Sequence, residues 1–144
     1  MNIHMETTKL SVYTDGGARG NPGPAGCGVI IFDSNDNLVD VANFYLGTAT
    51  NNQAEYTALL KAVTIVKKYA PTEVTFYLDS ELVVKQLNKE YKIKDANLRG
   101  LAEKIEAMLS ESGINKFTFK HIPREQNKFA DKLVNLAMDI ALAK

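Results

Sequence analysis

A glycine- and proline-rich segment separates the first two apolar stretches of the chain. Residues 9–14 alternate in hydrophobicity, and Asp15 then precedes five glycines and two prolines within residues 16–26. Glycine adopts backbone angles that other residues avoid and proline restricts φ, so residues 13–26 predict a tight, shaped turn. The turn would hold Asp15 at the end of a strand. There it either accepts local hydrogen bonds or contributes to a functional site.

Length and composition predict one globular domain. The 144 residues are 45% hydrophobic and 24% charged, which is ordinary for a single domain with a proper core. Cys27 is the one cysteine, so the chain has no internal disulfide and no zinc-binding cysteine cluster. No stretch matches a membrane span or a signal peptide. We expect a monomeric, cytoplasmic domain over residues 1–144, without membrane association and with residues 1–8 as a flexible extension.

Hydrophobic periodicity predicts five strands and four helices in the order βββαβααβα. The expected strands are 9–14, 25–32, 38–46, 73–78 and 116–122, and the expected helices are 50–69, 79–89, 95–112 and 127–142. The helix before the fourth strand makes that strand a parallel partner of the first. We therefore expect an α/β fold with a five-stranded mixed sheet and helices on both faces. In the last helix, helical spacing groups Phe129, Leu133, Leu136, Ala137 and Ile140.

Four carboxylates lie at boundaries between these elements. Asp15 follows the first strand and Asp79 follows the fourth, so parallel pairing would bring both to one edge of the sheet. Glu55 and Asp131 fall in the first turns of their helices. Each has a structural alternative: Asn52 and Glu55 resemble a capping box, Asp79 could cap a helix, and Asp131 could favour a helix dipole.

Together the four carboxylates indicate a cation site. Clustered carboxylates raise one another's pKa unless a cation neutralises them. Ligands that are all oxygen, with positions left for water or phosphate, suit Mg²⁺ or Mn²⁺ rather than zinc.

The basic residues leave two interpretations open. Seventeen basic and seventeen acidic residues cancel, so net charge does not indicate a polyanionic partner. Lysines and arginines are nevertheless frequent between Lys85 and Lys104. They form either the solvated face of ordinary helices or a surface that follows a phosphate backbone.

Four ordered motifs resemble the type 1 ribonuclease H family. They are Thr14-Asp15-Gly16-Gly17 with Asn21-Pro22-Gly23, then Thr50-Asn51-Asn52 with Glu55, then Asp79-Ser80, and finally Asn127 with Ala130-Asp131. The resemblance extends over most of the chain and implies the ribonuclease H-like fold, in a short form without a basic insertion or a hybrid-binding domain. It also implies an endonuclease that hydrolyses the RNA strand of RNA/DNA hybrids and leaves 5′-phosphate and 3′-hydroxyl ends.

The resemblance assigns site residues as well. It implies that two Mg²⁺ or Mn²⁺ ions are held by catalytic carboxylates, namely Asp15, Glu55, Asp79 and Asp131. It implies that the hybrid contacts Gly16, Asn21, Thr50 and Asn52.

Some positions depart from the family pattern. Glu81 stands where many relatives carry glutamine, and the connection at residues 90–95 is short and lacks tryptophan. Many relatives place a mobile histidine before the last carboxylate. Here His121 is either that residue or a structural residue at a strand end, and Arg124 or Glu125 could lie nearer the metals.

Two other functions are compatible with this fold. A non-catalytic module that binds RNA or RNA/DNA hybrids could use the same fold, as could another polynucleotidyl transferase. A nucleotide-binding loop is excluded because no Gly-Lys-Ser/Thr follows the glycines.

Overall fold

The first three strands form an antiparallel meander. In the computed structural model, which describes residues 7–143, these strands are β1 (Lys9–Ala18), β2 (Gly23–Asp33) and β3 (Leu38–Ala49). Most of the expected N-terminal extension, residues 1–6, lies outside the described residues. The chain is anchored from Thr8, whose carbonyl accepts hydrogen bonds from the amides of Thr72 and Glu73.

A helical crossover adds the remaining strands in parallel. After β3 come α1 (Asn51–Val66), the 3-10 turn η1 (Lys67–Tyr69), β4 (Glu73–Leu78), α2 (Glu81–Leu87), α3 (Ala96–Glu111), β5 (Lys116–His121), the 3-10 turn η2 (Arg124–Gln126) and α4 (Lys128–Leu142). The strand order is β3-β2-β1-β4-β5, with β4 parallel to both β1 and β5. A parallel partner needs a long connection, which α1 provides.

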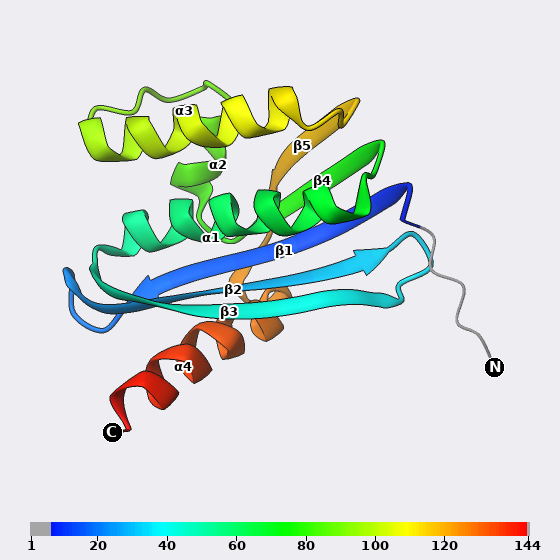
Figure 1. The fold of residues 1–144 in the computed structure, drawn as a ribbon. Helices are drawn as coiled ribbons and strands as arrows, with labels where there is room; N and C mark the ends of the chain where they lie inside the picture. The colour runs from blue at the N-terminus through cyan, green and yellow to red at the C-terminus, as the bar shows by residue number, and fades with distance from the viewer. Residues whose placement is uncertain (1–6, 144) are drawn as a thin grey trace.

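The helices cover both faces of the sheet. Figure 1 shows α1 and α3 on one face and α4, in red, on the other. The core lies between the sheet and α1, where Val12, Ile31 and Phe76 are fully buried against Tyr56 and Leu59. The expected α/β fold with a five-stranded mixed sheet is confirmed. No helix in residues 7–143 has both the length and the apolar character needed to cross a bilayer. The expected cytoplasmic location stays a prediction.

The first strand is longer than predicted. It was expected to end at Thr14, but the ladder with β2 continues to Ala18, and only the residues around 19–22 form the turn. Glycine in an extended strand satisfies the backbone pairing as other residues do, so glycine content alone did not locate the turn. On its other side, β1 pairs with β4 only as far as Tyr13. Asp15 is therefore paired with β2 on one side, whereas on its other side it lies beyond the end of the β4 pairing.

Two glycines let helices approach the sheet closely beside Asp15. A Cβ on Gly16 would collide with the backbone of α1 at Ala54 and Glu55. A Cβ on Gly28, which pairs with Asp15, would lie 2.6 Å from Leu133 Cβ and 2.7 Å from the Ala130 carbonyl oxygen of α4. Side chains at these positions would push both helices away. The glycines thus let α1 pack against β1 at Gly16 and let α4 pack against β2 at Gly28.

The buried face of α4 differs from the predicted stripe. Ala137 is buried as predicted and Leu133 is half-buried, but Phe129, Leu136 and Ile140 are exposed. The other residues that pack inward are Ala130, Val134 and Met138. Glycines in the strand beneath explain this face: Ala130 packs over Gly28, where the helix comes closest, and Met138 finds room over Gly26.

Substitution of Gly28 tests this packing. We expect Gly28→Ala to lower the free energy of unfolding by about 1–3 kcal/mol, because overpacking forces backbone shifts. Gly100 is the control: it lies within α3, and a Cβ there meets nothing within 4 Å. Gly100→Ala should raise the stability by about 0.5–1 kcal/mol. Urea denaturation of both variants measures the difference, and equal effects would contradict the packing described.

Candidate active site

A cavity occupies the space where β1 extends past the end of β4. Its volume is about 490 Å³, and its walls come from β1, the first two turns of α1, the residues that follow β4, η2 and α4. Glu55, expected in the first turn of its helix, lies just beyond that turn. All four carboxylates singled out from the sequence line it, together with Gly16 and Asn52. Elements distant in the sequence therefore converge on one rim of the sheet, as expected for ligand sites in open α/β sheets.

Three of the four carboxylates form a tight cluster. Asp15, Glu55 and Asp79 each offer an oxygen atom, and these atoms lie within 4.8 Å of one another. Asp15 and Glu55 are each only 7% exposed, and Asp79 is half-buried. Asp131 lines the same cavity from the first turn of α4 but is outside this tight group.

Local helix capping does not account for Glu55 or Asp79. The capping box of α1 joins Thr50 and Gln53: the Thr50 hydroxyl accepts from the Gln53 amide, and the Gln53 side chain accepts from the Thr50 amide. Ser80, not Asp79, caps α2 by accepting from the Val83 amide. The capping alternatives for these two carboxylates are therefore wrong. Asp131 does lie in the first turn of α4, where the helix dipole favours a negative charge.

Burial and mutual repulsion shift the acidity of the cluster. Burial, and then the negative charges of Asp79 and Asp131, raise the pKa of Asp15 to about 7, although a hydrogen bond with Glu55 opposes the rise. Burial and the charges of Asp15 and Asp79 likewise raise the pKa of Glu55 well above its ordinary value. Among the described residues, the buried Oε2 of Glu55 has no hydrogen-bond partner. The cavity therefore holds more negative charge than its own protein groups neutralise.

The cationic side chains of the cavity do not remove this excess. Arg19 lines the cavity, but its guanidinium is paired with Asp139 at 2.6 Å and also contacts Asn135 at 3.4 Å. Arg124 is the second arginine in the wall. Clustered, partly unpartnered carboxylate oxygens with space beside them fit Mg²⁺ or Mn²⁺, which prefer oxygen ligands.

Two of the four residues expected to contact substrate line the same cavity. Gly16 and Asn52 line it, and Asn51, not assigned from the sequence, does so as well. Asn51 joins β1 to α1, because its Oδ1 accepts from the Ala18 amide and its own amide donates to Asn21 Oδ1 at 3.0 Å. Asn21 and Thr50 are themselves not part of the cavity wall. The Thr50 hydroxyl caps α1, as described, and keeps its hydrogen for donation.

The structure separates His121, Arg124 and Glu125. Arg124 contributes to the cavity wall from η2. His121 is the exposed last residue of β5, paired with Leu78, and neither it nor Glu125 contributes to that wall. The structure therefore places His121 at a strand end, and Arg124 is the member of this group that faces the carboxylates' cavity.

Asn127 was not singled out from the sequence as a site residue. Its Nδ2 donates to the Thr14 carbonyl at 2.8 Å and to Asp79 Oδ2 at 3.1 Å. The sequence feature that could have identified Asn127 is its position four residues before Asp131. Spacing alone does not say whether an asparagine before a helix caps that helix or contacts another strand.

The basic segment near α2 is partly neutralised. Lys85 contacts Glu81 at 3.0 Å and lies over the Tyr91 ring, and Lys89 contacts Glu106 at 3.1 Å. These exposed pairs favour the solvated-face interpretation. They are also weak enough to rearrange around a phosphate backbone, so both interpretations stay open.

Comparisons with known proteins agree with this geometry. Residues 13–137 match a protein family described as "Reverse transcriptase-like". The chain is 32% identical to a "Ribonuclease H" of Polaromonas naphthalenivorans, covering 92% of this chain and 89% of that protein. It is 37% identical to "Bifunctional protein Rv2228c" of Mycobacterium tuberculosis over 92% of the chain, but it spans only 36% of that relative's length. Among solved structures, LC11-RNase H1 in complex with an RNA/DNA hybrid has a TM-score of 0.89 at 44% identity, covering 92% and 99% of the two chains.

The raised pKa of Asp15 predicts a pH-dependent stability. A carboxyl whose pKa is higher in the folded than in the unfolded chain stabilises the fold when protonated. For Asp15 this contribution is complete below its unfolded pKa, near 3.8, and is lost as the pH rises through about 7. In EDTA, Asp15→Asn should therefore be more stable than wild type at pH 8, by a few kcal/mol at most, since one pKa unit is worth about 1.4 kcal/mol.

Denaturation of both proteins at pH 4 and pH 8 measures this effect. The advantage of the variant should shrink toward pH 4 and should be offset at pH 8 when Mn²⁺ stabilises the wild type. A difference that does not depend on pH would contradict the raised pKa.

Proposed function

Since this chain belongs to the type 1 ribonuclease H family, we propose that it hydrolyses the RNA strand of RNA/DNA hybrids. The observation that carries the proposal is the convergence of Asp15, Glu55 and Asp79 within 4.8 Å in a cavity that Asp131 also lines. The relative with a TM-score of 0.89 was solved with an RNA/DNA hybrid, which supports the same substrate class here.

The four carboxylates would hold two Mg²⁺ or Mn²⁺ ions. When bound, such ions activate a water molecule and stabilise the departing oxygen of a phosphodiester, giving 5′-phosphate and 3′-hydroxyl ends. The chain's contribution is to keep the carboxylates together at some electrostatic cost. Burial of Asp15 and Glu55 limits competition from bulk water, and because their pKa values are raised, these carboxyls would give up protons when they bind the ions.

Substrate choice would come from hydrogen bonds to sugars and phosphates. Gly16 and Asn52 line the cavity, Asn21 is hydrogen-bonded to the wall residue Asn51, and Thr50 caps the helix that carries Asn51 and Asn52. Reading 2′-hydroxyl groups across a shallow minor groove distinguishes RNA from DNA. Since such contacts avoid base edges, cleavage should depend little on base sequence.

Arg124 would place a positive charge beside the scissile phosphate. A guanidinium presents several donors in a rigid plane and suits phosphate oxygens. Its place in the cavity wall makes it the better candidate than His121 for a role in the reaction.

Removal of one carboxylate tests the catalytic assignment. Asp15→Asn and Asp79→Asn should each lower the cleavage rate of a labelled hybrid by more than about 100-fold, because even residues that only orient metal ligands contribute about 10–100-fold. Circular dichroism should show both variants folded. Full activity in either variant, or wild-type activity in excess chelator, would refute the assignment.

A substrate panel separates the enzyme from a binding module. Wild-type protein titrated with Mg²⁺ and with Mn²⁺ should cut the RNA strand of a hybrid much faster than duplex RNA or duplex DNA. End analysis should find 5′-phosphate groups. Tight hybrid binding without cleavage at any metal concentration would favour the non-catalytic module instead.

The different placement of Arg124 and His121 gives a paired test. Arg124→Ala should lower kcat by about 10- to 100-fold, since a hydrogen bond to a charged group contributes about 1.5–3 kcal/mol. His121→Ala should leave kcat within about twofold, as expected for an exposed residue outside the cavity. The opposite order of effects would reassign the role to His121.

A further inference from the structure

Asn127 stands at the N-cap of α4 but does not cap it. The N-cap residues of the other three α-helices, Thr50, Ser80 and Asp95, have extended backbones, and each side chain accepts a hydrogen bond from its own helix. Asn127 has φ −120° and ψ 27°, and its side chain makes no such bond. Asparagine is among the residues best suited to capping, so its side chain has been directed elsewhere.

The Asn127 amide group is directed at the carboxylate cluster. Both hydrogens of Nδ2 are donated, one to the Thr14 carbonyl and the other to Asp79 Oδ2. Since a carbonyl and a carboxylate both only accept, the opposite orientation of the amide would bring oxygen against oxygen. The orientation is therefore determined by its partners.

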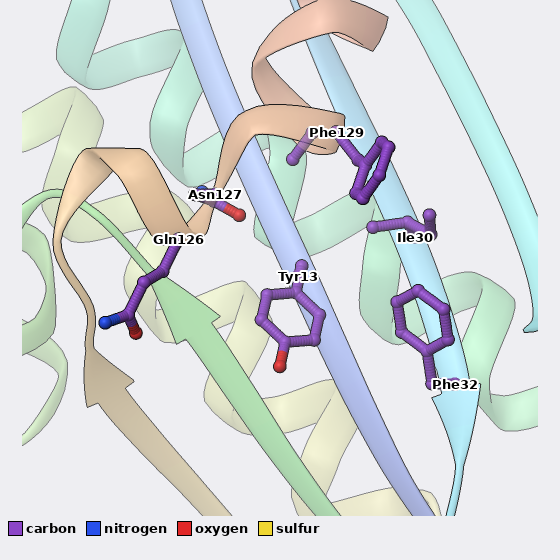
Figure 2. A pocket seen from close by; sticks show the side chains of 7 residues that line it. Tyr13, Ile30, Phe32, Gln126, Asn127 and Phe129 are labelled. Carbon is purple, nitrogen blue, oxygen red and sulfur yellow. The ribbon is translucent and has the colours of Figure 1, made fainter. Parts of the chain in front are cut away.

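The other end of the amide is left without a partner. Asn127 is 2% exposed, and its Oδ1 has no hydrogen bond among the described residues. Asn127 lines a second pocket, of about 200 Å³, together with Tyr13 and Phe129. Figure 2 shows the side-chain oxygen of Asn127 on the side of Tyr13. A buried unpaired acceptor costs stability, as does an uncapped helix. The unpaired oxygen and the uncapped helix both result from the side-chain orientation in which Nδ2 donates to Asp79.

We propose that Asn127 is a positioning residue that holds the carboxylates in place for the metal ions. This role of Asn127 rests on the proposed function, because it concerns the same metal site. Asn127 precedes the helix that carries Asp131, binds the carbonyl next to Asp15, and binds Asp79 directly. One amide group thus joins the three segments that supply three of the four carboxylates.

The hydrogen bond from Asn127 holds Asp79 in place against the repulsion of the neighbouring carboxylates. Asp79 is half-buried and faces the charges of Asp15 and Glu55, so without a donor its side chain would turn toward solvent. Thr14 is the first β1 residue beyond the β4 pairing, and its carbonyl obtains from Asn127 a partner that β4 does not supply. Loss of Nδ2 would release both groups, and the bound ions would then have to order them.

The test compares Asn127→Ala with a matched control. Asn43→Ala removes a similar bond, since Asn43 Nδ2 donates to the Leu133 carbonyl of α4 at 3.1 Å, and neither residue lines the carboxylates' cavity. We expect Asn127→Ala to weaken Mn²⁺ binding by about 10- to 100-fold in calorimetric titrations without nucleic acid. Asn43→Ala should stay within twofold of wild type, although both variants lower the melting temperature.

Cleavage assays give a second readout. In Asn127→Ala the Mg²⁺ concentration for half-maximal activity should rise by the same factor, and kcat should recover at saturating Mg²⁺. Asp79→Asn should not recover. Unchanged Mn²⁺ affinity in Asn127→Ala, or an equal loss in Asn43→Ala, overturns the proposal. A wild type that binds Mn²⁺ but leaves hybrids uncut refutes the proposed function alone, and the affinity comparison still decides the role of Asn127.

A measurement on the wild type covers the case in which Asn127→Ala does not fold. In metal-free protein, both Nδ2 hydrogens of Asn127 should exchange with solvent at least about tenfold more slowly than those of the exposed Asn51 side chain, because both are hydrogen-bonded and buried. Equal exchange rates would overturn the proposal.

Discussion

The site depends on holding negative charges together against their repulsion. Asp15 and Glu55 are buried, lie within reach of Asp79, and have raised pKa values as a result. A fold that only needed stability would pair these groups with lysine or arginine, yet Arg19 in the same cavity is bound to Asp139 instead. Stability is given up locally once these carboxyls are ionised, and bound cations would recover it, which would make ion binding and the order of the site one coupled process.

Backbone geometry makes this concentration of charge possible. The β1 strand continues beyond β4, so the edge beside Asp15 is open on one side while β2 supports it on the other. Gly16 in β1 then lets α1 pack closely against the sheet, and Gly28 in β2 does the same for α4. The same absence of side chains brings in the helices that carry Glu55 and Asp131. Strand length and glycine placement therefore determine the site as much as the acidic residues do.

The sequence predicted the order of elements and the convergence of acids, because hydrophobic periodicity and strand ends are local signals. It did not predict that β1 continues to Ala18, since glycine is compatible with both a turn and a strand. It grouped Phe129, Leu136 and Ile140 on α4, whereas Ala130 and Val134 face the sheet. Periodicity identifies an amphipathic helix. How close that helix lies, and so which side chains fit beneath it, depends on Gly28 in another element.

Asn127 shows why the hydrogen bonds that support the carboxylates could not be predicted from the sequence. Local rules assign an asparagine before a helix to capping, and Thr50, Ser80 and Asp95 follow that rule here. Asn127 breaks it, leaves its oxygen unpaired, and donates to Asp79 and to β1. Violations of local rules concentrate where function imposes a competing requirement. The uncapped helix is therefore informative: among the four α-helices of the described chain, α4 is the one whose N-cap side chain serves the carboxylates rather than its own helix.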